Sequence, residues 1–517
     1  MRDFEIIIPY YNGEKTILKL IETIPGDIQI ILVDDQSTNA LPNLAEYKNV
    51  RVIKDKKKGY FTGAVNFGLE STSGDVLILN QDVYFTNTKW IDQLEKALKE
   101  GYSYIGERIR GTREDWPNSY IHGTYMYLTR ELIDRVGLMN AELYPMWGST
   151  AEYQLRAARA NFKILPLQTV EGFIHRRPAK ESFGNSFKEL LQNEPDKKRE
   201  FVLTPPLVSV IIPVYGEKYA QFLPSTINSL IGGKTDLGEW KQQTFASFEV
   251  VIVEDSSTDN TPQIIDGLCD GWKAVRAIHL KRPQKEVIQN GRYAGKVFAL
   301  NAGIKAAYGK YITILDCDDM MAEDRLQRLY ETSVANPHSL VYDAIKPFIT
   351  AYDGSLDVFM SSLIEHNPNV SVEDLRLGEP VILTGKPAEY DFDNLIYKNT
   401  IHNAIMFEKS AWKEVGGYPE RFMFGREDWA MNVRLGSYGY CGVQVPNDYA
   451  GLYYRRDGQN RTNENAKSDW MKYFQSQMVK EFRNLYKGER PMSCCSGNKK
   501  VSQTDNLEQI NLSKYYY

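Results

Sequence analysis

A set of four short sequence segments occurs twice in this chain of 517 residues, and the duplication limits the folds that the chain can adopt. Four segments of the first half return in the second half in the same order. The pairs are 5–15 (EIIIPYYNGEK) with 209–218 (SVIIPVYGEK), 31–38 (ILVDDQST) with 251–258 (VIVEDSST), 64–68 (AVNFG) with 299–303 (ALNAG), and 77–82 (LILNQD) with 313–318 (TILDCD). A repeated order of this kind indicates two copies of one structural unit, and the length also favours two domains.

Each copy alternates short apolar runs with amphipathic stretches. The runs are rich in Ile and Val, as strands are, and a stretch such as 90–99 has the spacing of a surface helix. This alternation predicts a mainly parallel sheet with helices on both faces. We therefore expect the α/β class, with two tandem Rossmann-like domains.

The limits of the two domains follow from changes in composition. A charged run and the pair Pro205-Pro206 precede the second copy, and the chain becomes polar from about residue 487. We expect an N-terminal domain at 1–180, a linker at 181–206, a C-terminal domain at 207–486 and a mobile tail at 487–517. The role of Cys494 and Cys495 in the tail stays open.

The composition is that of an ordinary globular protein. Hydrophobic residues make up 42% and charged residues 25%, and the formal net charge of −5 disfavours a nucleic-acid acceptor without excluding one. Five cysteines without a framework spacing favour reduced thiols. No stretch has the ~20 apolar residues of a membrane-spanning helix. We expect a cytoplasmic protein and leave peripheral contact with a membrane open.

Carboxylates end several of the apolar runs. In open parallel sheets, ligands bind outside the carboxyl ends of the strands, so these side chains should meet in one crevice. Asp316 and Asp318 of the second copy have the oxygen ligands that Mg²⁺ and Mn²⁺ favour, with substrate phosphates completing the shell. Alone, this pattern is equally consistent with helix capping.

Neighbouring segments favour the metal interpretation. Asp255 lies one strand and helix after the first strand of its copy, where it could hydrogen-bond a nucleotide base. Lys296 could reach a phosphate, and the small residues near Asn301 permit close backbone approach. Asp428, beside Glu427, could accept a proton from an acceptor hydroxyl, although both also suit the first turn of a helix.

Taken together, these segments resemble glycosyltransferase family 2, whose members have the GT-A fold and invert the anomeric carbon. The resemblance rests on 210–213 (VIIP), 253–259 (VEDSSTD), 315–319 (LDCDD), 415–418 (VGGY) and 427–429 (EDW). It implies a sugar transfer from a nucleotide-diphosphate sugar, with a UDP-sugar as the expected donor, to a glycan or other hydroxyl-bearing acceptor. The implied cofactor is Mn²⁺ or Mg²⁺.

The resemblance also assigns roles to residues of the second copy. Asp428 would be the base, next to Glu427, and Asp318 would bind the metal together with Asp316. Arg455 or Arg456 would clamp the diphosphate. The implied donor contacts are Pro213, Tyr215, Glu254, Asp255, Lys296, Asn301, Asp316, Arg455 and Arg456.

The first copy resembles the rhamnosyltransferase-like branch of the same family. Asn80 and Asp82 replace the aspartate pair, and His175 falls where relatives carry a metal-binding histidine. The candidate donor and metal residues of this copy are Pro9, Asp34, Asp35, Asn66, Asn80, Asp82 and His175.

The first copy departs from the family at the catalytic helix. Alignment of Arg156 with Arg434 places Ser149 and Thr150 opposite Glu427 and Asp428, and neither hydroxyl is a useful base near neutral pH. Glu152 lies one turn on and is a candidate substitute. We favour a first domain that is impaired in catalysis and binds a nucleotide or a glycan.

Three other functions remain open at this point. Both domains could be active, which would make a bifunctional enzyme, or both sites could have decayed into a carbohydrate- or nucleotide-binding protein. A nucleotidyltransferase is disfavoured because no glycine-rich phosphate loop follows Pro213. The stretch 319–427, which is longer than its counterpart in the first copy, should build the acceptor site.

Overall fold

The computed structural model describes residues 4–55, 57–110, 119–146, 148–160, 162–175, 204–269, 274–349, 381–382, 389–456 and 468–489. The chain forms two compact units, residues 1–204 (unit 1) and 205–517 (unit 2). Almost all of the predicted linker and tail, with Cys494 and Cys495, lies outside the described residues, so the exact domain limits stay a prediction.

Unit 1 is built on a seven-stranded sheet with the order β3-β2-β1-β4-β7-β6-β8. The first four strands of that order are parallel, β7 is antiparallel to β4 and β6, and β8 is parallel to β6. A separate antiparallel pair joins β5 to β9. The strands are β1 (Phe4–Tyr10), β2 (Ile30–Asp34), β3 (Val50–Lys54), β4 (Asp75–Leu79), β5 (Val83–Phe85), β6 (Tyr104–Arg110), β7 (Ser119–Leu128), β8 (Ile164–Leu167) and β9 (Phe173–His175).

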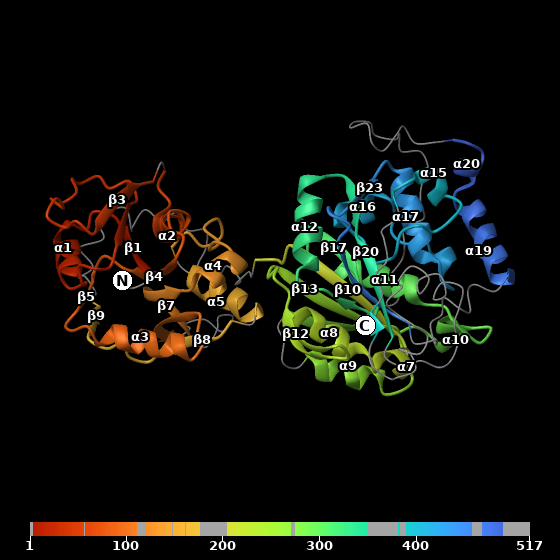
Figure 1. Ribbon diagram of the computed structural model, residues 1–517, viewed down its shortest axis with the longest axis horizontal. Coiled ribbons are helices and arrows are strands. Elements are labelled where there is room, and N and C mark those ends of the chain that lie inside the picture. Colours follow the sequence, from red (N-terminus) through yellow and green to blue (C-terminus); the bar gives the residue numbers. More distant parts are fainter. Residues whose placement is uncertain are drawn as a thin grey trace. The chain divides into compact units, whose positions relative to one another are not determined.

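Helices cover both faces of this sheet. Successive residues of a strand point to opposite faces, and the apolar side chains on each face pack against helices. Ile6 and Ile8 pack with α1 and α3, whereas Ile7 packs on the other face with α2, α4 and α5. Figure 1 shows this layering in each unit. The helices are α1 (Glu14–Glu22), α2 (Tyr60–Glu70), α3 (Lys89–Lys99), α4 (Arg130–Val136) and α5 (Ser149–Arg159).

Unit 2 has a seven-stranded sheet with the order β14-β13-β10-β17-β22-β19-β23. Its first four strands are parallel, and β22 is antiparallel to both neighbours. The strands of this sheet are β10 (Val208–Val214), β13 (Phe248–Glu254), β14 (Val275–His279), β17 (Tyr311–Ile314), β19 (Ser339–Tyr342), β22 (Met406–Glu408) and β23 (Cys441–Gln444).

Smaller sheets flank the main sheet of unit 2. Their strands are β11 (Gly232–Thr235) with β12 (Gly238–Gln242), β15 (Ile288–Gln289) with β16 (Arg292–Tyr293), and β18 (Met320–Met321), β24 (Ala450–Arg455), β20 (Ala344–Ile349) and β21 (Val381–Ile382). The helical segments are α7 (Glu217–Ala220), α8 (Leu223–Ile231), α9 (Thr261–Cys269), α10 (Gln284–Val287), α11 (Lys296–Ala306), α12 (Arg325–Ala335), α15 (Phe392–Leu395), α16 (Lys409–Glu414), η2 (Glu420–Phe422), α17 (Glu427–Ser437), α19 (Ser468–Glu481) and α20 (Arg483–Tyr486).

The two main sheets have the same topology, strand for strand, which confirms the predicted repeat and the α/β class. In both sheets a central parallel block is followed by one reversed strand, β7 or β22. The mainly parallel sheet places the loops after β10, β13 and β17 at one edge. In the described ranges, no helix combines the length and apolar character that a membrane crossing requires.

Candidate active site

The candidate site residues of unit 2 lie at the carboxyl edge of its central strands. Tyr215 follows β10, Asp255 follows β13, and the aspartates at 316, 318 and 319 follow β17. Because β13, β10 and β17 are parallel neighbours, these loops emerge at the same edge of the sheet.

Lys296 connects three elements at this edge. Its Nζ lies 2.8 Å from Asp316 Oδ1 and 3.1 Å from Glu427 Oε1, so the ends of β17, α11 and α17 meet here. Burial alone would lower the pKa of Lys296, but the charges of Asp316 and Glu427 raise it well above its usual value. The structure thus brings together three residues that the sequence assigned to one crevice.

Asp428 stands beside this ion-pair network at the start of α17. Its side chain is half-buried, and the amide Nδ2 of Asn399 donates to its Oδ2 at 2.8 Å. The helix starts after Arg426, whose φ of 61° is left-handed and turns the chain sharply at this point. A half-buried carboxylate that one hydrogen bond orients has the position expected of a general base.

The aspartates after β17 form a group of closely spaced carboxylates, of which Asp316 pairs with Lys296. Burial, followed by mutual repulsion, raises the pKa of Asp318 and of Asp319. The Oδ1 of Asp319 accepts a hydrogen bond from the backbone of Arg455, while its Oδ2 is buried without a hydrogen-bond partner in the described structure. Among the described residues, no three His, Cys, Asp or Glu side chains are already arranged to hold a metal ion.

Asp255 is fully buried, and two side chains engage one of its oxygens. Arg282 donates to Oδ2 at 2.6 Å and the hydroxyl of Tyr293 donates to it at 2.8 Å. Burial raises the pKa of Asp255 to about 6, against the opposing effect of Arg282. The ring of Tyr293 is stacked on that of Tyr215, with centroids 4.2 Å apart and planes 4° from parallel.

Both predicted arginine clamps are buried rather than presented at the edge. Arg455 donates from Nε to the carbonyl of Asp318 at 2.9 Å and pairs with Asp236 of the β11–β12 turn. It packs between the rings of Phe222 and Phe348. Arg456 is 6% exposed, and its backbone joins β20. Arg455 therefore holds the aspartate loop, and the contact of Arg455 or Arg456 with the diphosphate stays a prediction.

Asn301 and Asn66 each bind the backbone of a loop in their unit. Asn301 is fully buried and exchanges two hydrogen bonds with the backbone of Tyr418. Asn66 does the same with the backbone of Met139. Each amide thus holds a loop through its nitrogen and its oxygen, and the predicted donor contacts of Asn301 and Asn66 stay predictions.

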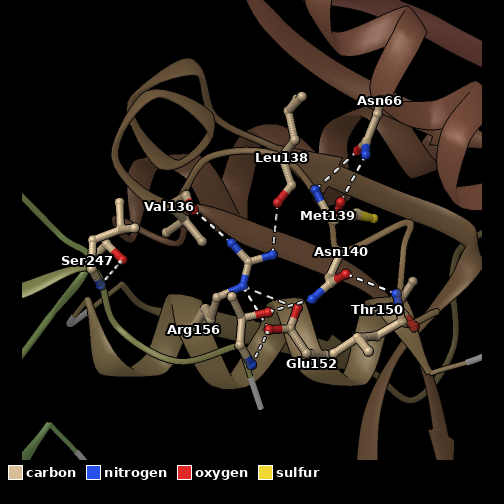
Figure 2. Close-up of polar contacts among 12 residues, drawn as sticks. Asn66, Val136, Leu138, Met139, Asn140, Thr150, Glu152, Arg156 and Ser247 are labelled. Carbon is tan, nitrogen blue, oxygen red and sulfur yellow. Dashed lines mark hydrogen bonds and ion pairs between the residues drawn. The ribbon is translucent and has the colours of Figure 1, made fainter. Parts of the chain in front are cut away.

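In each unit an arginine also binds the segment that precedes the residue held by the asparagine. We call each asparagine and arginine together the loop clamp. Arg156 of α5 donates to the carbonyls of Val136 and Leu138, as Figure 2 shows. Arg434 of α17 donates to the carbonyl of Gly417 at 2.8 Å. The two units therefore fix the loop before Met139 or Tyr418 by the same pair of side chains.

Asp34 and Glu254, the last residues of β2 and β13, each stabilise the turn that follows their strand. Asp34 accepts a hydrogen bond from the backbone of Ser37 at 2.9 Å, and Glu254 accepts one from Ser257. Pro9 and Pro213 lie inside β1 and β10. These four residues shape the edge, and their predicted donor contacts stay predictions.

Unit 1 keeps part of the predicted site. Asp82 and His175 meet, with Oδ2 and Nε2 3.5 Å apart, and Asn80 joins β7 through its backbone. Asp35 accepts a hydrogen bond from the backbone of Gly59 at 2.6 Å, and burial raises its pKa to about 6.

Unit 1 has no counterpart of the base among its described residues. Helix α5 begins at Ser149 and α17 at Glu427, which confirms the predicted alignment of Thr150 with Asp428. Glu152 is fully buried, pairs with Arg156 at 2.9 Å and accepts a hydrogen bond from the backbone of Thr204 (Figure 2). It cannot substitute as the base because its oxygens are enclosed in this network.

Comparison with known proteins identifies the family. The family model for glycosyl transferase family 2 matches residues 5–156 and 209–355, which together make up more than half of the chain, with one match in each repeat. The chain belongs to glycosyltransferase family 2.

Individual relatives of this family 2 glycosyltransferase are distant. An uncharacterised glycosyltransferase of Rickettsia felis is 24% identical over 407 residues, which cover 62% of each protein. GlyG of Streptococcus pneumoniae is 30% identical over 125 residues, 24% of this chain and 34% of GlyG. The structure of S. aureus TarS 1–349 with UDP-GlcNAc has 19% identity and a TM-score of 0.34, and the match covers 54% of this chain and 66% of TarS 1–349. The chain spans 62% of the length of the first Rickettsia relative.

Sequence analysis missed several residues that lie near the candidate sites of the two units. Arg282 and Tyr293 contact Asp255, and the only local sign of their placement was the turn-forming pair Asn290-Gly291. In unit 1, His122 lies near His175 with ring centroids 6.1 Å apart, and near Glu107. Glu107 lies at a β-bulge between β6 and β7, and the alternation of apolar and polar residues does not predict a bulge there.

Proposed function

We propose that unit 2 is an inverting glycosyltransferase that transfers a sugar from a nucleotide-diphosphate sugar to an acceptor hydroxyl. The observation that supports this proposal most is the contact of Lys296 with Asp316 and Glu427, beside Asp428. Carboxylates from two distant segments and the half-buried ammonium group of Lys296 meet at the edge where parallel sheets bind ligands. Capping of separate helices would not require this convergence.

In the proposed reaction, Asp428 takes the proton of the acceptor hydroxyl as the oxygen attacks the anomeric carbon. The bond from that carbon to the diphosphate oxygen breaks in the same displacement, which inverts the carbon. Asn399 orients the carboxylate of Asp428 through the 2.8 Å hydrogen bond. Lys296 is placed to stabilise the negative charge that grows on the departing diphosphate.

The residues after β17 suit a divalent cation, Mn²⁺ or Mg²⁺, with Asp318 and Asp316 as its protein ligands. Their oxygens are hard ligands, and the repulsion that raises the pKa of Asp318 would be relieved by a positive charge. When bound, the cation would neutralise the diphosphate leaving group.

For unit 1 we propose binding without transfer. Asp35, Asp82 and His175 remain at its sheet edge, which favours a nucleotide or a glycan as ligand. The first residues of α5 offer no carboxylate where α17 has Asp428. We propose a UDP-sugar as the donor for unit 2, a glycan as its acceptor, and the cytoplasm as the compartment.

A donor panel tests the proposed function. Release of nucleoside diphosphate from UDP-, GDP- and dTDP-sugars is measured with Mn²⁺ and with EDTA, for the wild type and Asp318→Asn. At least one donor should turn over, and both EDTA and the substitution should reduce the rate at least about 100-fold. Asp266→Asn, at an exposed carboxylate of α9, is the control and should keep the wild-type rate. Failure of every donor, or full activity of Asp318→Asn, would refute the proposal.

A further inference from the structure

Tyr293 makes the two contacts that a nucleobase would make at this edge. Its ring lies flat on Tyr215, with centroids 4.2 Å apart, and its hydroxyl donates to Asp255 at 2.8 Å. A nucleobase is likewise a flat ring with an N–H donor at its rim. Tyrosine therefore reproduces both the stacking and the polar contact.

The arrangement leaves no space for a base between the two rings. A third ring would need roughly twice the observed separation of the centroids. Gly295 shows how closely Tyr293 is packed here: a Cβ at this position would lie 2.0 Å from Asp255 Oδ2 and 2.2 Å from the Tyr293 ring. A base can use Tyr215 and Asp255 in this way only after Tyr293 has moved.

The partners of Asp255 divide into a fixed one and a displaceable one. The side chain of Arg282 is 1% exposed, and it also donates to the carbonyls of Glu286 and Ala294, so it stays in place. Tyr293 is only half-buried. The Oδ1 of Asp255 is buried and has no hydrogen-bond partner in the described structure, which leaves one acceptor ready for a ligand donor.

Tyr293 lies on the second strand of a short hairpin. The hairpin β15–β16 forms a two-stranded sheet of its own, separate from the seven-stranded sheet. Its turn residues Asn290 and Gly291 both have positive φ, 53° and 72°, as the tight two-residue hairpin turn requires. Arg292 lies over the ring of Trp470 at 3.8 Å.

We propose that Tyr293 occupies the base position of the donor site in the donor-free protein, and that a nucleoside diphosphate binds by displacing this ring with its hairpin. The inference rests on the proposed function, because it takes the edge of unit 2 as a nucleotide site. It adds a built-in competitor whose contacts lower the apparent donor affinity.

Binding of UDP and of GDP with Mn²⁺, measured by calorimetry, tests the inference. Tyr293→Ala should bind at least one of them about tenfold more tightly than the wild type, because the competing stack and hydrogen bond are gone. Tyr293→Phe keeps the ring and should fall between the two. Tyr308→Ala removes an exposed tyrosine elsewhere in unit 2 and should leave the affinity unchanged.

Weaker or unchanged binding by Tyr293→Ala, with the fold intact by circular dichroism, would overturn the inference, since Tyr293 would then be a wall of the site or a bystander. Absence of binding of both nucleotides to the wild type and to both Tyr293 variants would overturn it too. Turnover by Asp428→Asn separates the two proposals. Full turnover by that variant would refute the proposed base while leaving tighter binding by Tyr293→Ala intact.

Discussion

Glu152 and Asp428 show how the surroundings of a carboxylate decide its role. Both lie in the first turn of corresponding helices, α5 and α17. Asp428 keeps a half-buried side chain with one hydrogen bond from Asn399. Glu152 is sealed in the core of unit 1 and neutralises Arg156. In unit 2, Glu481 of α19 pairs with the corresponding Arg434, which leaves the helix start available for chemistry.

A substitution of Glu152 should therefore affect folding and not turnover. Glu152→Gln leaves Arg156 without its charged partner, and loss of one member of a buried pair costs about 3–5 kcal/mol. We expect a lower free energy of unfolding of unit 1 in urea, with transferase activity of the folded protein unchanged.

Glu131→Gln is the matched control for this prediction. Glu131 and Arg135 of α4 have the same spacing along the helix, but Glu131 is 69% exposed, so the loss should be below about 0.5 kcal/mol. If Glu152→Gln abolished turnover without changing stability, our structural role for Glu152 would be wrong.

At the scale of elements, a buried ion pair joins α12 to the end of β19. Arg325 and Asp343 are both fully buried, and Nη2 of the arginine lies 2.7 Å from Oδ1 of the aspartate. His402 Nε2 donates to the backbone carbonyl of Asp343 at 2.9 Å. Burial alone would raise the pKa of Asp343, but the charge of Arg325 and the hydrogen bonds hold it well below its usual value.

The lowered pKa of Asp343 predicts an acid-sensitive contribution to stability. A carboxyl whose pKa is lower in the folded state stabilises the fold above its unfolded pKa of about 3.9, and the contribution is lost as the pH falls below that value. Asp343→Asn should therefore destabilise unit 2 by about 3–5 kcal/mol at pH 7. The difference from the wild type, measured by urea unfolding, should shrink below about pH 4, and a difference that is constant down to pH 2 would contradict this.

The sequence predicted elements better than side-chain partners. The repeated apolar runs were sufficient to place the central strands, because burial on both faces demands continuous apolar residues. They could not show that Asn301 holds Tyr418, or that Arg455 is enclosed by Phe222 and Phe348. Those contacts join segments far apart in the chain, and polar residues that serve a ligand look the same in sequence as those that serve a loop.

For the whole molecule, two units of one topology differ at the position that we propose to be the catalytic base. Both keep the loop clamp, made by Asn66 with Arg156 or by Asn301 with Arg434. Duplicated folds retain the contacts that stability requires, while the site residues can diverge. Alignment on the paired asparagines places Phe61 of unit 1 where unit 2 has Lys296. Among its described residues, unit 1 therefore keeps the framework but has no lysine at the position of Lys296 and no carboxylate at that of Asp428.

The most direct test compares two substitutions at matched positions of the repeat. Thr150 and Asp428 are each the second residue of their helix, so Thr150→Val and Asp428→Asn probe the two units equally. Nucleoside-diphosphate release is measured for both with the active donor. Asp428→Asn should lower kcat at least about 100-fold, while Thr150→Val keeps the wild-type kcat. Equal loss in both variants, or a loss only in Thr150→Val, would contradict the assignment of transfer to unit 2.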